Sequence, residues 1–209
     1  MKKEKSWDNA WEKIFRSRAW GKYPPEELIR FIARNYYKVP DRKQIKILDV
    51  GCGAGAAVWY IAREGFSAYG IDGSDTAIKI AKERFAKEGL KGSFKVGDII
   101  SLDYTKEYFN CVVDVCAIQH NKTEAVKKIL KEIRRVLKPG GKVFSMLLST
   151  KTKLSKNNSY ADFGYTNFFT EKGIKMLFKD FRNLQIERSE RTDNGNVIAH
   201  FVVTAEKLK

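Results

Sequence analysis

Three glycines directly after an apolar run form the strongest candidate for a ligand-binding turn. The stretch reads ILDVGCGAGA over residues 47–56, with glycines at positions 51, 53 and 55. Glycine lets the backbone approach a ligand closely and adopt conformations that other residues avoid. Counted from Gly51, the spacing fits both GxGxxA and GxGxG, so the glycines alone leave a nicotinamide or flavin dinucleotide open as the ligand.

Asp49 separates these alternatives by its charge. It lies two residues before the first glycine, at the carboxyl end of an expected strand. A dinucleotide would bring its pyrophosphate to the N-terminus of the helix that follows the turn. A carboxylate there would repel two phosphates, whereas it suits a ligand that carries a sulfonium and an ammonium. The turn therefore predicts S-adenosylmethionine.

Two more acidic positions suit the rest of that molecule. Asp72 ends the next expected strand, about 20 residues after the turn, where a carboxylate accepts hydrogen bonds from both ribose hydroxyls. Asp98 and Ile99 follow the third strand, where Asp98 can accept from the adenine amine while Ile99 packs on the ring. Each carboxylate alone is also consistent with a helix cap or a solvated turn, but all of them in this order favour a ligand site.

These side chains need a parallel sheet to bring them to one edge, and the chain shows the matching pattern. From residue 45 onward, short apolar runs alternate with amphipathic helices, which indicates a parallel sheet covered on both faces. The last two strands are joined by a hairpin turn at 193–195, so the sheet should end in an antiparallel pair. Strands are predicted at 45–50, 68–72, 93–96, 111–115, 142–149, 184–192 and 197–206, and helices at 56–64, 75–88, 123–137 and 171–178.

We expect one domain, because 209 residues with 43% hydrophobic content suffice for one core. The fold class is α/β, a Rossmann-like doubly wound sheet, mostly parallel, with an N-terminal helical cap. The expected parts are the cap at 1–44, a cofactor-binding core at 45–150, a lid segment at 151–169, and a C-terminal helix and strand pair at 170–209.

Taken together, the motifs resemble those of the class I S-adenosylmethionine-dependent methyltransferases. Beyond the glycine turn, the likeness includes AYGIDGS at 68–74, GDI at 97–99, YFNCVVD at 108–114, Gln119-His120, LKPGGK at 137–142 and FFT at 168–170. It covers roughly residues 45–205 and is specific for the fold and cofactor. Asn110 departs from the pattern, because many members have Asp there.

The resemblance implies a role for each matching position. It places Gly51, Gly53 and Gly55 against the methionine part of the cofactor, with Asp49 near the amino group. It also implies Asp72 and Gly73 at the ribose, and Asp98 and Ile99 at the adenine. Asp114 and Val115 would lie close to the methionine and the methyl group.

His120 and Asp114 are the candidate catalytic residues. Methyl transfer from a sulfonium mainly requires alignment and exclusion of water, and a base is needed only if the acceptor must lose a proton. His120 follows the fourth strand, where the acceptor should approach. Its alternative role is to fix a loop, and the alternative role of Asp114 is to accept a hydrogen bond from a nearby backbone amide.

The predicted acceptor is a small molecule. The Asn/Asp-Pro-Pro-aromatic motif of enzymes that methylate base amines is replaced by DVCA at 114–117, and the Pro-Cys and Thr-Cys settings of 5-methylcytosine enzymes do not occur. Trp20, Tyr23, His120 and Tyr165 are the predicted substrate contacts. Trp11 lies on a helical stripe, which favours the core, with the pocket wall as its alternative position. No metal site is assigned.

The net charge of +15 keeps an RNA or protein methyltransferase as an alternative, although lysines spread along helices are typical of solvated faces. A non-catalytic scaffold that binds S-adenosylmethionine is another. With no apolar run near 20 residues, we expect a cytoplasmic protein without membrane association. Three cysteines without CxxC spacing indicate free thiols.

Overall fold

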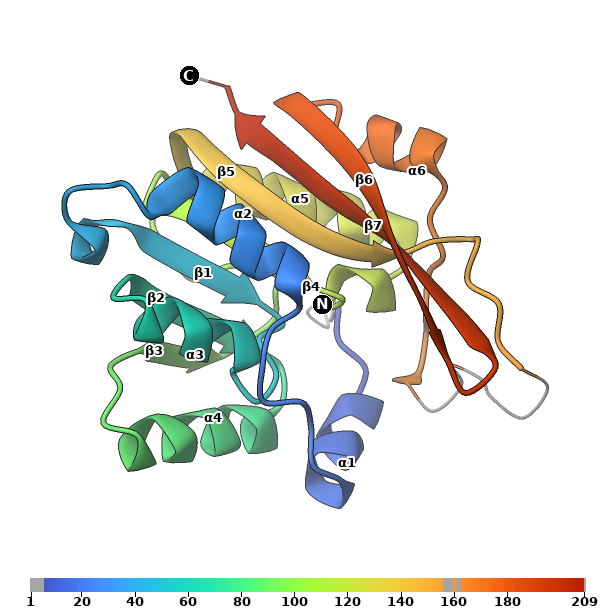
Figure 1. The fold of residues 1–209 in the computed structure, drawn as a ribbon, viewed down its shortest axis with the longest axis horizontal. Coiled ribbons are helices and arrows are strands. Elements are labelled where there is room, and N and C mark those ends of the chain that lie inside the picture. Colours follow the sequence, from blue (N-terminus) through green and yellow to red (C-terminus); the bar gives the residue numbers. More distant parts are fainter. Residues whose placement is uncertain (1–5, 156–159, 161–162, 209) are drawn as a thin grey trace, which may run out of the picture.

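The computed structural model describes residues 6–155, 160 and 163–208, and these form an α/β fold around a single sheet (Figure 1). Within the described residues the sheet has seven strands in the order β3-β2-β1-β4-β5-β7-β6. β7 runs antiparallel to both of its neighbours, while the other pairs are parallel, so the predicted Rossmann-like sheet with an antiparallel end is confirmed. The strands are β1 (Lys46–Val50), β2 (Ser67–Asp72), β3 (Ser93–Val96), β4 (Phe109–Val115), β5 (Leu137–Leu148), β6 (Phe181–Asp193) and β7 (Asn196–Lys207).

Helices cover both faces of this sheet. α2, α3 and α4 contribute to a buried cluster on one face, and α5 and α6 to a second cluster on the other. Figure 1 shows α2 and α3 in front of the sheet and α5 behind it. The helices are α1 (Ala10–Ser17), α2 (Glu26–Tyr36), α3 (Ala56–Arg63), α4 (Asp75–Lys87), α5 (Thr123–Val136) and α6 (Glu171–Leu177), with short 3-10 turns η1 (Arg42–Gln44) and η2 (Ile118–His120).

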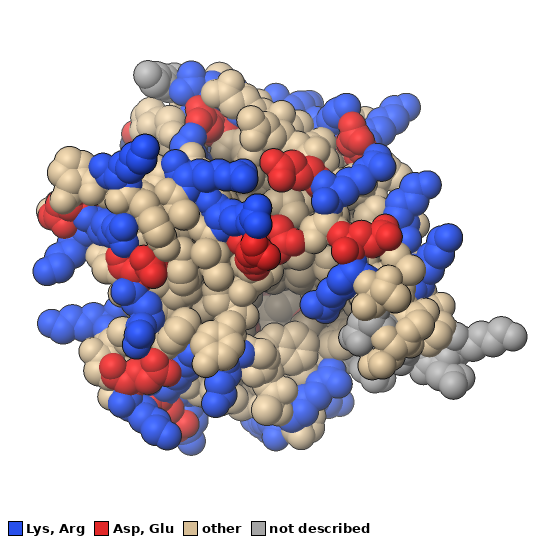
Figure 2. Space-filling model, in the orientation of Figure 1, with Lys and Arg blue, Asp and Glu red and all other residues tan. Residues whose placement is uncertain are grey.

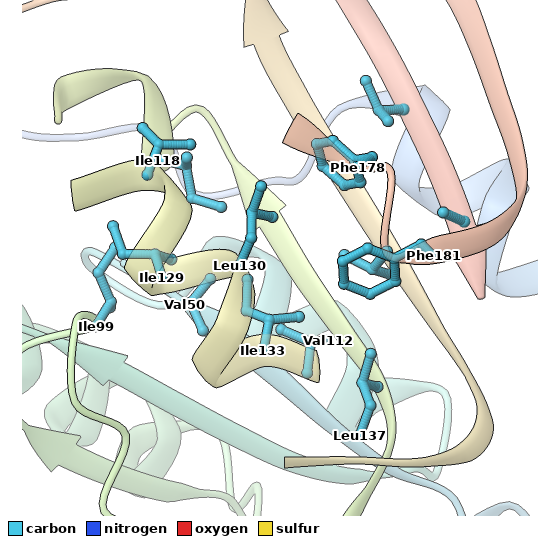
Figure 3. Close-up of a cluster of buried hydrophobic side chains, with 14 of the residues drawn as sticks. Val50, Ile99, Val112, Ile118, Ile129, Leu130, Ile133, Leu137, Phe178 and Phe181 are labelled. Carbon is cyan, nitrogen blue, oxygen red and sulfur yellow. The ribbon is translucent and has the colours of Figure 1, made fainter. Parts of the chain in front are cut away.

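The amphipathic pattern of α5 explains how that face is closed. Its apolar residues recur at spacings of three and four, so they share one side of the helix. Ile129 and Ile133 are fully buried against Val112 of β4, and Phe178 after α6 completes the layer (Figure 3). Burying a side chain of this size stabilises the fold by roughly 1.5–3 kcal/mol. The layer keeps the strand ends at fixed positions.

The predicted N-terminal cap is divided in two by the structure. The apolar face of α2, with Leu28, Phe31 and Ile32, belongs to the cluster on the sheet, so α2 is a layer helix. Only α1 stands apart, beside α4 at the carboxyl ends of the strands. The predicted cap is thus helical, but the sequence pattern does not say against which surface each helix packs.

β5 begins earlier than predicted. The helix ends at Val136 as expected before the Lys-Pro-Gly-Gly stretch, but Leu137 already pairs with Phe109. The register then shifts before Cys111 pairs with Lys142, and Gly140 has a φ of +73°. The glycines therefore form an irregularity inside the strand and not a separate loop.

Other expectations fall in part outside these residues. Positions 156–159 and 161–162 of the predicted lid lie outside the described residues, as do 1–5 of the cap and residue 209. Cys52, Cys111 and Cys116 are free thiols, as predicted. Among the described helices, none has the length and apolarity needed to cross a membrane.

Candidate active site

A cavity of about 660 Å³ opens at the carboxyl ends of the parallel strands. Figure 2 shows a hollow near the middle of the face, where β1 ends in Figure 1. We define three regions of its wall. The acidic end comprises Asp49, Gly51, Gly53, Asp72, Gly73 and Ile99; the aromatic end comprises Trp11, Trp20, His120, Tyr160 and Phe163; and the hairpin wall comprises Arg191, Asn196, Ile198 and His200.

The glycine turn lies at the acidic end, and its backbone explains the residue type. Gly51 has a φ of +69°, and a Cβ at this position would stand 2.2 Å from the Cβ of Ala117. Its N–H donates to the carbonyl of Ile71 at 2.8 Å, which ties the turn to β2. Any larger residue would be strained and would also push against the loop after β4.

Asp49 is a buried carboxylate that lacks a counter-charge. It is 2% exposed, and its Oδ1 has no hydrogen-bond partner among the described residues. Burial raises its pKa well above the ordinary value, and the nearby Asp114 and Asp72 add to this. An unpaired buried carboxylate is costly unless a cation or donor joins it. Because Asp49 lines the cavity, this end fits a ligand group with positive charge and N–H donors.

Asp72 lines the same end and supports the turn. Its Oδ2 accepts from the N–H of Gly53 at 2.8 Å and its Oδ1 from that of Ser74 at 2.9 Å. Burial raises its pKa, although these backbone bonds counteract the shift. A carboxylate oxygen has room for a second donor, so Asp72 can also receive a ligand hydroxyl.

Asp98 is placed differently from the other carboxylates. Its neighbours Gly97 and Ile99 line the cavity, but the side chain of Asp98 is bonded to the N-terminal segment. Oδ2 accepts from the N–H of Ser6 at 2.7 Å, and Oδ1 accepts from the Ser6 hydroxyl and from the N–H of Ile100. Ser6 therefore holds the carboxylate that the sequence assigns to the adenine amine.

Asp114 lies beneath the cavity wall and does not form part of it. It is fully buried, its Oδ1 accepts from the N–H groups of Ala117 at 2.8 Å and Ile118 at 3.0 Å, and its Oδ2 accepts from the Ser145 hydroxyl. Burial raises its pKa to about 6. The structure thus shows the alternative that the sequence left open, a carboxylate that fixes the turn after β4. Its neighbour Val115 does line the cavity.

His120 reaches the cavity wall, held by hydrogen bonds on both nitrogens. The N–H of Leu148 donates to Oε1 of Gln119 at 2.8 Å, which orients the Gln119 amide so that its Nε2 lies 3.3 Å from His120 Nε2. An amide NH₂ can only donate, so His120 Nε2 is the acceptor and the proton resides on Nδ1. Nδ1–H in turn donates a hydrogen bond to the carbonyl oxygen of Tyr165, at 3.3 Å from Nδ1.

The charge state of His120 follows from its surroundings. Burial lowers its pKa to about 4, and the bond to the Tyr165 carbonyl only partly offsets this. The ring is therefore neutral near pH 7. A neutral imidazole can accept a hydrogen bond, but with this pKa it is a weak base, and the Gln119 amide already occupies its lone pair.

Aromatic rings surround His120. Trp11 meets it edge-on with 4.7 Å between ring centroids, and Trp11 stacks on Phe163 at 5.5 Å. Trp20 packs edge-on against Trp11 at 5.7 Å. The assignment of Trp11 to the core is therefore wrong. Its ring is half-buried and faces the cavity, because α1 lies at the strand ends and not on the sheet.

Of the other three predicted substrate contacts, two line the cavity and one is outside the described lining. Trp20 and Tyr23 line the cavity, and Tyr23 is 71% exposed at its mouth, edge-on to Trp59. Tyr165 is outside the described lining and contributes its carbonyl to His120. The irregular segment around Tyr165 does contact His120, but the sequence does not show whether such a contact is made by a side chain or by the backbone.

Several site residues carried no signal in the sequence. Glu12 of α1 accepts from the Ser74 hydroxyl at 2.5 Å and the Thr76 hydroxyl at 2.6 Å, which ties α1 to the N-terminus of α4. These bonds lower the pKa of Glu12 to about 2. Phe15, one turn further on, comes within 3.0 Å of where a Cβ of Gly53 would be. Such long-range contacts join segments that look unrelated along the chain.

Comparison with known proteins gives consistent results. A family model described as a methyltransferase domain matches residues 47–141. Norajmaline N-methyltransferase from Rauvolfia serpentina is 33% identical over 121 residues, which is 56% of this chain and 40% of that protein. A sterol 24-C-methyltransferase from Neurospora crassa is 31% identical over 56% of this chain and 32% of its own length. The chain spans less than two thirds of the length of the curated relatives that it matches first.

Solved structures agree over more of the chain. An S-adenosylmethionine-dependent methyltransferase from Methanosarcina mazei is 27% identical, with a TM-score of 0.69 over 85% of this chain and 97% of its own. A Haemonchus contortus phosphoethanolamine N-methyltransferase, solved with S-adenosylmethionine, matches 96% of this chain and 56% of its own with a TM-score of 0.73. At 21% identity the second likeness shows the fold alone.

Proposed function

We propose that the chain is an S-adenosylmethionine-dependent methyltransferase that transfers a methyl group from this cofactor to a small-molecule acceptor. The match of residues 47–141 to a methyltransferase-domain model and the likeness to solved methyltransferases support this proposal. The observation that carries the proposal is the cavity itself. It joins an acidic end, with the unpaired carboxylate of Asp49, to an end lined by aromatic rings. A polymer would need an open groove, whereas these walls suit a small molecule.

The acidic end would hold the cofactor. S-adenosylmethionine supplies, when bound, a methyl group on a sulfonium that needs no further activation. Asp49 would balance the positive charge of the ligand, Gly51 and Gly53 leave space for its methionine part, and Asp72 would accept from the ribose. Asp98 would accept from the adenine amine once Ser6 gives up that carboxylate. Ile99 would pack on the ring.

The aromatic end would align the acceptor and exclude water. The rings of Trp11, Trp20 and Phe163 are apolar walls that favour a flat or apolar body. His120 would accept a hydrogen bond from the acceptor through Nε2, in competition with Gln119. It would take a full proton only from an acidic acceptor group, because its pKa is low. Asp114 acts as a positioning residue through Ala117.

Calorimetry and a transfer assay test this function. The protein should bind S-adenosylhomocysteine and not NAD, and labelled methyl groups from S-adenosylmethionine should enter a small-molecule pool. Binding of NAD without S-adenosylhomocysteine would refute the proposal. Label in RNA with steep salt dependence, or in protein, would favour the alternatives motivated by the +15 charge.

Figure 2 bears on the RNA alternative. On the visible face, basic side chains are interspersed with acidic ones and do not form a continuous stripe.

A non-catalytic scaffold would bind the cofactor and yield no methylated product in any pool. The expected cytoplasmic location stays a prediction.

A further inference from the structure

We propose that the acceptor carries an anionic group, a carboxylate or a phosphate, which Arg191 and His200 bind at the hairpin wall. This inference rests on the proposed function and names the substrate class of the same site. It starts from the pairing of β6 with β7, which brings one polar side chain from each strand of the hairpin to the same part of the cavity.

The register of the hairpin places these residues on the same face. Arg191 of β6 lies opposite Ile198 of β7, and Ser189 lies opposite His200. Opposed residues of an antiparallel pair point to the same side, and diagonal neighbours are within reach of long side chains. Arg191, Ile198 and His200 all line the cavity, so that side is the one facing the site.

Arg191 is available for a ligand. It makes no ion pair within 4.0 Å in the described part of the chain, whereas Arg182 and Arg188 of the same strand pair with Glu206 and Glu171. Among the described lining residues it is the one Lys or Arg side chain. A guanidinium presents a planar fork of N–H donors that matches carboxylate and phosphate oxygens.

His200 complements this cation. Its ring makes no hydrogen bond to the described residues, although it lines the cavity. Burial lowers its pKa to about 4, with a further contribution from the charge of Arg191. The neutral ring has one N–H to donate to an anion. The nearby Glu27 carboxylate is engaged by the Ser189 hydroxyl.

The lining charges differ between the parts of the wall. Asp49 and Asp72 belong to the acidic end, Asp8 lies beside Gly164, and Arg191 is the cation of the hairpin wall. Arg191 lines the cavity together with Cys116, Tyr160 and His200. A molecule with an anionic group at Arg191 and an apolar body against the aromatic rings fits these walls.

Four small aromatic probes test the proposal on protein saturated with S-adenosylhomocysteine. Phenyl phosphate and benzoate are the anionic probes, benzyl alcohol is the neutral one, and benzylamine is the cationic one. Titration followed by tryptophan fluorescence should give at least about tenfold tighter binding of one anionic probe than of benzyl alcohol. The preferred anion distinguishes a phosphate from a carboxylate acceptor.

Arg191→Gln should abolish this preference and leave the affinity for S-adenosylhomocysteine within about twofold. Arg191→Lys should retain part of it, since the charge remains but the fork is lost. Arg188→Gln is the matched control on the same strand, and it should change neither quantity because Arg188 pairs with Glu171. His200→Gln, a second variant, should weaken anion binding by a smaller factor.

The outcomes that overturn the proposal are distinct from failure of the proposed function. Equal binding of anionic and neutral probes, or a preference that survives Arg191→Gln, would overturn it while S-adenosylhomocysteine still binds. Tighter binding of benzylamine would overturn it as well. Loss of anion binding in Arg188→Gln to the same extent would indicate a general polyanion surface. No binding of S-adenosylhomocysteine by the wild type would instead refute the function itself.

Discussion

The acidic end and the aromatic end of the cavity are built in different ways. The acidic end comes largely from residues 49–99, within three consecutive parallel strands and the turns that follow them. The aromatic end and the hairpin wall draw on α1, η2, the segment around Phe163 and the β6–β7 hairpin. The residues proposed to bind the cofactor are thus close together in the sequence, while those proposed to bind the acceptor come from distant parts of the chain.

Gly51→Ala should have the largest effect, because it breaks the acidic end through the backbone. The positive φ and the 2.2 Å contact with the Cβ of Ala117 leave no room for a methyl group. We expect the free energy of unfolding to fall by about 2–4 kcal/mol, and affinity for S-adenosylhomocysteine by at least about a hundredfold. Denaturant unfolding and calorimetry measure the two.

Gly140→Ala is the control for that substitution. Gly140 has a similar φ of +73°, but nothing lies within 4 Å of the added carbon. The free energy of unfolding should therefore fall by only about 1 kcal/mol, from backbone strain, and the affinity for the cofactor should not change. Equal losses in both variants would mean that the close approach at Gly51 does not matter.

Asp49→Asn should separate binding from stability at the acidic end. Burial raises the pKa of Asp49 in the folded state, so above its unfolded pKa the charged carboxylate destabilises the fold. The variant should therefore melt at a higher temperature at pH 7, while its affinity for S-adenosylhomocysteine falls about ten- to a hundredfold. Asp103→Asn, at an exposed side chain, should change neither. A less stable Asp49→Asn would contradict the assigned charge.

The same division explains how much could be predicted from the sequence. The positions of the strands along the chain, the glycine turn and Asp49 are governed by local patterns, so they could be identified from the sequence. The positions of Glu12, Phe15 and Arg191 depend on long-range packing that no local pattern records. For Trp11 and Asp114 the local pattern allowed two readings, and only the surrounding elements decide between them.

Trp20→Ala should affect the aromatic end alone. Its ring packs edge-on against Trp11 and Phe15 and lines the cavity. Once an acceptor is known, kcat/KM should fall about tenfold, while the affinity for S-adenosylhomocysteine changes by less than about twofold. Tyr165→Ala is the control, because that residue contributes its carbonyl and not its ring. A larger loss in Tyr165→Ala would favour the sequence-based assignment of its ring.

The smallest expected effect is a pH dependence of stability from the aromatic end and the hairpin wall. Burial lowers the pKa of His120 and His200 to about 4, below the ordinary value of 6.5. Between these values the unfolded chain binds protons that the folded chain does not, so the free energy of unfolding falls as the pH drops from about 6.5 to 4. We expect a loss on the order of 1 kcal/mol per histidine.

Comparison with the His120→Gln/His200→Gln double variant isolates this slope. The contribution of Asp49 has the opposite sign, since its raised pKa favours the folded state at low pH, but it is common to both proteins. Urea unfolding at pH 5 and pH 7 should show a flatter dependence for the double variant. Identical slopes would mean that the two rings bind protons equally in the folded and the unfolded chain, so that burial does not lower their pKa.

α1 is the one described helix that touches both ends of the cavity. Glu12 accepts a hydrogen bond from Ser74, next to Gly73, and Phe15 packs against Gly53. Trp11, from the same helix, forms the wall beside His120. Any displacement of α1 that accompanies filling of one end alters the other. Thermodynamic linkage makes this effect reciprocal. If bound cofactor changes the affinity for the acceptor by some factor, bound acceptor changes the affinity for the cofactor by the same factor. This eight-residue helix would thereby couple the two proposed ligand sites.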